Sequence, residues 1–138
     1  MFADATYVKV RARGRGSLGR SWWPRECAWV HFDDGKANLL TDRSIAEIDD
    51  ALNLAEDQGD VVAIYGRPGI FSGDFDLKVL SKGLDESLEL ILAGFRLGLR
   101  LMTFPRPVVM GCTGHAIALG AFLLLAGDHR LETHGRCA

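Results

Sequence analysis

Backbone N–H groups in two glycine-marked turns are the strongest candidates for chemistry in this sequence. Residues 105–128 run from a Pro-flanked apolar strand through a turn containing Gly111, Gly114 and Gly120 into a short apolar helix. Glycines in such a turn let the backbone approach a ligand where side chains would otherwise stand. A helix that begins near Leu119 or Gly120 directs its free N–H groups at whatever lies above the turn, which predicts a site for an anionic oxygen.

A second segment, residues 61–78, repeats this order of elements. An apolar strand pattern over 61–65 leads into a loop rich in Gly, Pro, Ser and Asp, and a predicted helix start follows. An upstream segment, residues 33–40 (DDGKANLL), adds a further turn. Two strand-end turns of this kind can converge on one ligand.

Together these segments resemble the crotonase superfamily, the enoyl-CoA hydratase/isomerase proteins. The family hallmarks are G-x-x-x-x-F-S-x-G-x-D-L and, later, P-x-P-V-x-x-x-x-x-G-x-A-x-x-x-G with a following Asp. The matching residues are Gly66, Phe71, Ser72, Asp76 and Leu77 in the first motif, and Pro105, Pro107, Val108, Gly114, Ala116, Gly120 and Asp128 in the second. The family's early Ala-Asn-x-Leu signature is met within residues 33–40, and the resemblance covers about residues 28–131.

The resemblance implies an α/β fold with a crotonase-like (ClpP/crotonase) parallel-sheet core and crossover helices. Residues 1–27 are expected to form an atypical basic strand and loop, and residues 28–138 the N-terminal portion of a family domain that is apparently truncated. The implied function is to bind an acyl-CoA thioester and to stabilise its enolate, with coenzyme A as part of the substrate and no other cofactor or metal. A catalytically inactive or truncated acyl-CoA-binding or interaction protein is the alternative.

The resemblance also assigns residues to a site. Two backbone donors for the thioester oxygen correspond to Phe75 and Leu119, with Gly120 beside the second. Preorganised donors of this kind are often the largest single contribution to catalysis. The expected substrate-binding residues are Ala37, Asn38, Leu39 and Lys78 near coenzyme A, Ser72, Asp76 and His115 in the turns, and Phe122 in the acyl pocket.

Departures from the family pattern bear on catalysis. Family hydratases carry a catalytic Glu where this sequence has Phe122, and their second catalytic Glu corresponds to a position beyond Ala138. Losing general acid/base catalysis typically costs about 10²–10⁴-fold per group. Asp74 replaces the family's Gly next to the first donor and brings a carboxylate close to the predicted oxyanion site. Family membership favours an enzyme, whereas these departures predict no hydratase turnover by this chain.

Helix and strand patterns position the turns. Residues 6–13 and 28–32 predict strands, and residues 129–133 begin like another. A first helix is expected to start with a capping box of Ser44 and Glu47 and to stop at Gly59, with its apolar face at Ile45, Ile48, Leu52 and Ala55. The strand-helix-strand order from Ala28 onward predicts a parallel sheet with right-handed crossovers.

A longer helix is predicted over residues 84–104. Asp85 is its expected N-cap, and Pro105 ends it. The apolar residues expected to form its buried stripe are Leu88, Ile91, Leu92, Phe95, Leu99 and Met102.

Composition bears on whether the protein is a membrane, secreted or disulfide-rich protein. The chain has 138 residues, of which 48% are hydrophobic, and a net charge of −2. No apolar run reaches the roughly 18 residues that span a bilayer, and no secretory signal is visible, so a cytoplasmic protein is expected. Three unevenly spaced cysteines predict reduced thiols rather than a disulfide framework. By resemblance, a full-length member is expected to form a homo-oligomer, a trimer or a hexamer.

Other motifs are less specific. Residues 14–19 (GRGSLG) match G-x-G-x-x-G, but the basic strand before them and Pro24 after them disfavour a dinucleotide site. The basic stretch over residues 9–25, with Trp22 and Trp23, makes nucleic-acid binding a weaker alternative.

Two side-chain constellations also fall short of a known site. Ser72, His115 and either Asp76 or Asp128 lack the G-x-S-x-G elbow of a hydrolase. A metal site built from His129, His134 and Cys137 lacks a fourth ligand at matching spacing.

Overall fold

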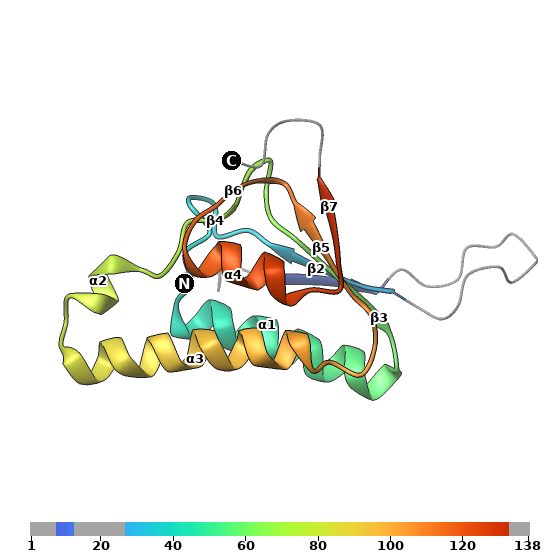
Figure 1. Ribbon diagram of the computed structural model, residues 1–138, viewed down its shortest axis with the longest axis horizontal. Coiled ribbons are helices and arrows are strands. Elements are labelled where there is room, and N and C mark those ends of the chain that lie inside the picture. The colour runs from blue at the N-terminus through green and yellow to red at the C-terminus, as the bar shows by residue number, and fades with distance from the viewer. Residues whose placement is uncertain (1–7, 13–26, 133–138) are drawn as a thin grey trace, which may run out of the picture.

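A five-stranded sheet forms the centre of the protein, for which the computed structural model describes residues 8–12 and 27–132 (Figure 1). Its strands lie in the order β1-β2-β3-β5-β7. Their bounds are Val8–Ala12 for β1, Cys27–Phe32 for β2, Val61–Tyr65 for β3, Val108–Cys112 for β5 and His129–Glu132 for β7. Strand β1 pairs antiparallel with β2, and all other neighbours in this sheet pair parallel. The predicted parallel α/β core is therefore confirmed.

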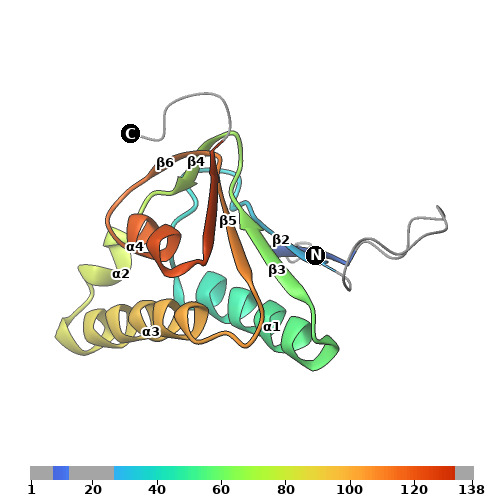
Figure 2. The same cartoon turned by 45° about the vertical axis from the view of Figure 1, so that its right-hand side comes forward.

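Helices and a small second sheet complete the described fold. The helices are α1 (Asp42–Gln58), α2 (Leu77–Leu80), α3 (Leu84–Met102) and α4 (Leu119–Ala126). Strands β4 (Gly69–Ser72) and β6 (Gly114–Ala116) pair parallel in the second sheet. Figures 1 and 2 show α1 and α3 side by side along the large sheet, with α4 next to α3.

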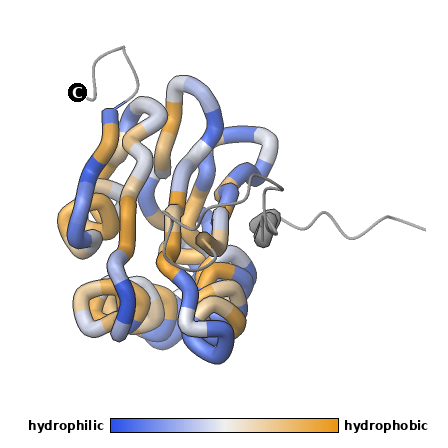
Figure 3. The backbone as a smooth tube through the Cα atoms, turned by 90° about the vertical axis from the view of Figure 1, so that its right-hand side faces the viewer, coloured by the Kyte–Doolittle hydropathy of each residue, from blue (hydrophilic) through white to orange (hydrophobic). Residues whose placement is uncertain are grey.

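The hydrophobic core lies between the large sheet and these helices. Figure 3 shows hydrophobic stretches in both the strands and the helices. The buried side chains include Val30, Phe32, Val62, Ile64, Val108 and Met110 from the strands, and Ile45, Ile48, Leu52, Leu90, Leu97 and Leu101 from α1 and α3. Since α1 buries its apolar face as the period of its sequence predicts, it fixes the loop that precedes it against the sheet.

The start of α1 differs from the prediction. Thr41 is the N-cap: its Oγ1 accepts a hydrogen bond from the Ser44 N–H at 3.1 Å, and the Ser44 Oγ accepts one from the Thr41 N–H at 2.9 Å. Ser44 thus occupies the N3 position of the capping box rather than its N-cap position, because a serine can act as donor or acceptor. Glu47 instead forms an ion pair with Arg43 at 2.9 Å. Gly59, with φ of 70°, ends the helix as predicted.

The buried stripe predicted for α3 is wrong. The helix follows Gly83 rather than an Asp85 cap, and it ends at Met102. Its buried residues are Leu90, Gly94, Leu97 and Leu101, whereas the predicted stripe is half-buried at Ile91 and exposed at Leu88, Leu92, Phe95, Leu99 and Met102. The helix is apolar on two opposite faces, so periodicity does not identify the one that faces the core. Gly94 does, because a Cβ there would lie 2.4 Å from Leu119 Cδ2.

The expectation of reduced cysteines holds for Cys27, which is a free thiol. Cys112, in contrast, is disulfide-bonded. The prediction fails there because spacing along the chain does not determine which sulfur atoms meet in space.

Several expectations fall on residues that the structure does not describe. These are the glycine motif at 14–19, the tryptophans at 22 and 23, and two of the three residues considered for a metal, His134 and Cys137. In the described part of the chain, no helix has the length and apolar character needed to cross a membrane.

Candidate functional site

The first predicted donor, the Phe75 N–H, lies where the chain leaves β4. The Leu40 N–H donates to the Asp74 carbonyl at 2.8 Å, and the Asp76 N–H donates to the Leu40 carbonyl at 3.2 Å. A planar trans peptide directs its N–H opposite to its C=O, so the Phe75 N–H points away from Leu40. No hydrogen bond of this N–H is found among the described residues. Among the described residues, this N–H therefore has no competing acceptor.

The second predicted donor, the Leu119 N–H, opens helix α4. Strand β6 leads into this helix, and the Ile117 N–H donates to the Ser72 carbonyl at 2.9 Å, which ties the turn to the end of β4. The backbone then turns sharply at Ala118, which has φ of 45°. Gly120 offers no donor to a ligand, because its N–H already donates to the Ile117 carbonyl at 2.9 Å. The donor role expected at this turn is thus left to Leu119.

A carboxylate of the protein itself already accepts a hydrogen bond from the second donor. The Leu119 N–H donates to Asp74 Oδ1 at 3.1 Å. Asp74 has φ of 86°, a conformation that favours glycine. The first N–H groups of a helix and its dipole both favour a negative charge at this position. The Asp74 carboxylate therefore stands where an anionic ligand oxygen would stand.

Glycines allow these elements to approach each other closely. A Cβ on Gly120 would lie 2.7 Å from the Cβ of Ser72, so α4 can begin against β4 only with glycine there. A Cβ on Gly94 would meet both Leu119 and the Phe75 ring, the latter at 2.9 Å. Both candidate donor residues therefore pack against Gly94 of α3 and are neighbours there.

An apolar pocket of about 360 Å³ has Leu119 among its lining residues. It lies between α3 and α4 and is lined by Gly94, Phe95, Gly98, Leu99, Met102, Leu119, Phe122, Leu123, Leu125 and Ala126. Among these described residues, none carries a titratable side chain. Phe122 lines this pocket, and its role in binding an acyl chain stays a prediction. Its ring can contact an apolar ligand but cannot transfer a proton.

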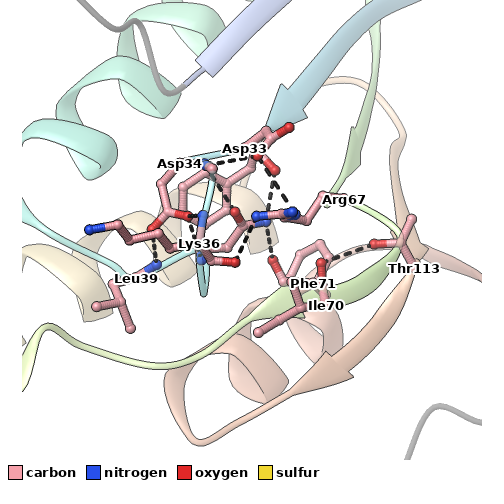
Figure 4. Close-up of polar contacts among 11 residues, drawn as sticks. Asp33, Asp34, Lys36, Leu39, Arg67, Ile70, Phe71 and Thr113 are labelled. Carbon is pink, nitrogen blue, oxygen red and sulfur yellow. Dashed lines mark hydrogen bonds and ion pairs between the residues drawn. The ribbon is translucent and has the colours of Figure 1, made fainter.

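The turn at residues 33–40, called the early turn below, is held by a network of side-chain to backbone hydrogen bonds (Figure 4). The Asp34 carboxylate accepts from the N–H groups of Lys36, Asn38 and Leu39, at 2.7 to 2.9 Å. Arg67 donates to the Lys36 carbonyl at 2.9 Å and lies 3.9 Å from a carboxylate oxygen of Asp33. These bonds fix the turn against the loop that follows β3.

Asn38 and Ser72 are buried behind the site rather than exposed in it. The Asn38 Nδ2 donates to the carbonyls of Phe32 and Phe71 at 2.8 and 3.1 Å. The Ser72 Oγ donates to the Asn38 carbonyl at 3.0 Å, so it does not pair with His115 as a hydrolase triad would require. Both side chains are fully buried and join the early turn to β4.

The remaining predicted site residues lie around this centre. Asp76 caps α2 by accepting from the Lys78 N–H at 2.9 Å, and Lys78 itself is exposed. His115 is exposed on β6, and Ala37 and Leu39 are half-buried in the early turn. Contact of these residues with substrate stays a prediction. In the described part of the chain, no three His, Cys, Asp or Glu side chains gather as a metal site would require.

Sequence reasoning missed the roles of Asp34 and Arg67. The Asp-Asp-Gly run at residues 33–35 is a signal for a side-chain-capped turn and could have identified Asp34. Arg67 has no such signal, because its partners lie in a segment distant in sequence.

Comparisons with known proteins agree with this architecture. The model of the enoyl-CoA hydratase/isomerase family matches residues 25–133. A curated relative, a probable enoyl-CoA hydratase of Bacillus subtilis (strain 168), is 31% identical over 99 residues, which make up 69% of this chain and 38% of that protein.

Solved structures show the same likeness. An enoyl-CoA hydratase/isomerase family protein from Pseudomonas syringae matches with a TM-score of 0.83 and 31% identity, over 95% of this chain and 52% of that chain. An enoyl-CoA hydratase from Mycobacterium marinum matches with a TM-score of 0.77 and 36% identity, over 90% of this chain and 50% of that chain. The chain thus spans about half the length of these solved relatives and 38% of the curated one. It belongs to the enoyl-CoA hydratase/isomerase family, and its parallel α/β core has the crotonase fold.

Proposed function

We propose that the protein binds an acyl-CoA thioester, with the thioester oxygen accepting hydrogen bonds from the Phe75 and Leu119 N–H groups. The observation that carries this proposal is the hydrogen bond of 3.1 Å from Leu119 N–H to a carboxylate oxygen. A donor that binds an anionic oxygen of its own chain has the position and polarity needed to bind a ligand oxygen. The second donor, at Phe75, has no competing partner among the described residues.

The acyl chain would enter the apolar pocket between α3 and α4. The pocket begins at Leu119, so a ligand whose carbonyl is held by that N–H has its chain next to the apolar side chains. Burial of apolar surface contributes about 25 cal/mol per Å², which favours acyl chains over short polar groups. Exposed Lys78, near the start of α2, is the proposed contact for the coenzyme A part of the ligand. No cofactor besides coenzyme A in the substrate is proposed.

Polarisation of the carbonyl is the chemical step that these donors support. Two N–H groups withdraw electron density from the thioester oxygen and would stabilise the enolate formed when a proton leaves the α carbon. That proton needs a base, and Phe122 supplies none. The proposed function of this chain is therefore acyl-CoA binding with carbonyl polarisation. Phe122 leaves this chain without the base that hydratase turnover would need at that position.

Calorimetric titration with hexanoyl-CoA and with free coenzyme A tests the binding proposal. Hexanoyl-CoA is expected to bind more tightly, and its thioester carbonyl stretch should shift to lower frequency in the complex. Equal affinity for the two ligands, or an unshifted carbonyl band, would contradict the proposed placement of the thioester.

A hydration assay with crotonyl-CoA tests the catalytic part. No turnover is expected, because a general acid/base group is missing at Phe122. A loss of the conjugated absorbance in proportion to the amount of protein would show that another residue supplies the proton chemistry.

A further inference from the structure

Gly98 lies on the side of α3 that faces the pocket, and packing does not require a glycine there. Apart from its chain neighbours and its own helix backbone, a Cβ at Gly98 would have one neighbour within 4 Å in the described part of the chain. That neighbour is Leu123 Cδ2 at 3.8 Å, an ordinary van der Waals distance. At Gly94, by contrast, a Cβ would lie 2.4 Å from Leu119 Cδ2. Alanine would therefore fit at position 98 and not at position 94.

Gly98 weakens the helix that carries it. Glycine inside a helix is destabilising relative to alanine, because it loses more backbone freedom on folding. Gly98 lies inside α3, which ends at Met102. The close contact with Leu119 explains the glycine at position 94, but no such contact explains Gly98. Gly98 does line the apolar pocket, where the absence of a side chain leaves room for a ligand.

We infer that Gly98 sets the length of acyl chain that the pocket accepts, and that it favours medium-length acyl chains over short ones. The inference rests on the proposed function, since it takes the thioester oxygen to lie at the Leu119 N–H. The walls that meet at Gly98 are α3 and α4, which lie next to each other within this chain (Figures 1 and 2). The space at Gly98 is therefore shaped by these two helices.

The contacts between α3 and α4 give the distance from the donor to Gly98. Gly94 faces Leu119, and Gly98 faces Leu123, so the same number of residues separates each pair along its helix. Four residues at 1.5 Å each make this distance about 6 Å. Since a C–C bond of about 1.5 Å advances an extended chain by roughly 1.25 Å, the acyl chain reaches Gly98 at about its sixth carbon. A butyryl chain ends before Gly98, and an octanoyl chain passes it.

The far end of the pocket suits an unsubstituted hydrocarbon. Beyond Gly98, the lining residues are Met102 on α3 and Ala126 on α4, both apolar. A polar group at the end of the acyl chain would lose its hydrogen bonds to water there, and neither of these side chains would replace them. The ligand class that this geometry supports is therefore a medium-chain acyl-CoA with a plain alkyl end.

Calorimetric titration of the full chain with butyryl-CoA, octanoyl-CoA and free coenzyme A tests the role of Gly98. Each buried methylene improves affinity about fourfold, so octanoyl-CoA should bind at least about tenfold more tightly than butyryl-CoA. Gly98→Leu should lower the octanoyl-CoA affinity to about that of butyryl-CoA and leave butyryl-CoA binding unchanged. Glu89→Leu, the matched control, adds the same side chain at an exposed position of α3 outside the pocket lining and should preserve the difference.

Gly98→Ala provides a second test that separates ligand binding from packing. Its methyl group enters the pocket, so octanoyl-CoA should bind about threefold to tenfold more weakly. The same variant should raise the midpoint of thermal unfolding by a few degrees, because alanine favours the helix and has room at this position. Weaker binding by a more stable chain would not follow from general damage to the fold.

The possible results distinguish this inference from the proposed function. Equal octanoyl-CoA affinities for the unmodified chain and both Gly98 variants would overturn the role of Gly98 and leave the proposed function intact. A lower unfolding midpoint for Gly98→Ala would show that packing against α4 requires the glycine, which also overturns the inference. If neither acyl-CoA binds the unmodified chain more tightly than free coenzyme A does, the proposed function fails and this inference fails with it.

Discussion

Replacing Asp74 with glycine should tighten acyl-CoA binding, because it frees a donor that the carboxylate now occupies. A thioester oxygen can reach the Leu119 N–H only after the bond of 3.1 Å to Asp74 Oδ1 has been broken. A hydrogen bond to a charged group contributes about 1.5–3 kcal/mol, and each 1.4 kcal/mol changes affinity tenfold. Asp74 is half-buried, so the lower end of that range applies. We expect Asp74→Gly to lower the dissociation constant for hexanoyl-CoA by about tenfold.

The backbone should tolerate this substitution. The φ of 86° at Asp74 lies in a region that glycine adopts without steric cost, whereas other residues are strained there by roughly 1–2 kcal/mol. Relief of that strain offsets much of the lost hydrogen bond, so the folded state should persist. Asp74→Asn keeps an oxygen acceptor without the charge, and we expect it to give an intermediate affinity.

Calorimetric titration of the three chains with hexanoyl-CoA and with free coenzyme A is the assay. Free coenzyme A has no thioester carbonyl, so its affinity should not change. Asp57→Asn removes a carboxylate at an exposed position of α1 and serves as the charge control. Equal hexanoyl-CoA affinities for the unmodified chain and Asp74→Gly, or an equal gain for free coenzyme A, would refute the placement of the thioester at Leu119.

Two further substitutions probe the scaffold of the site, and a third probes the thiol at the start of β2. Gly120→Ala should destabilise the fold by about 1–3 kcal/mol in chemical denaturation, because its Cβ would lie 2.7 Å from the Ser72 Cβ. The control Ala121→Gly should cost only about 1 kcal/mol. Equal losses of stability in the two variants would argue against the close contact. Asn38→Ala should lose about 2 kcal/mol or more by leaving the buried carbonyls of Phe32 and Phe71 without this donor, and unchanged stability would contradict it. Burial and the nearby Asp60 carboxylate raise the pKa of the Cys27 thiol, so Asp60→Asn should speed its alkylation at mildly alkaline pH, as followed by peptide mass spectrometry. An unchanged rate would show that the carboxylate does not act on Cys27.

Much of the fold follows from the sequence because the parallel strands and α1 carry one clear pattern each. Val61–Tyr65 is a short apolar run between turn signals, and Gly59 supplies the left-handed residue that ends α1. Helix α3 is the exception, since two apolar stripes compete for the core. Its buried side is decided by Gly94, whose missing Cβ admits Leu119 from a segment distant in sequence.

The family resemblance assigned the two donor roles to Phe75 and Leu119, and those roles stay a prediction. The sequence could point to such positions because backbone donors depend on where strands and helices begin and end. The bond between Asp74 and Leu119 was not predicted, although a carboxylate near the oxyanion position was. That bond depends on the φ of Asp74 and on the approach of α4, both of which are properties of the folded chain.

The two departures from the family pattern act on different parts of a ligand. Asp74 places a negative charge beside the donors, so the carboxylate of a free fatty acid would meet a like charge there. A neutral thioester carbonyl avoids this repulsion and still accepts hydrogen bonds. Phe122 leaves the pocket apolar, which suits the acyl chain but provides no proton acceptor. Because an enolate would bring negative charge back next to Asp74, the site favours the thioester before proton loss, and this is why we expect binding without turnover.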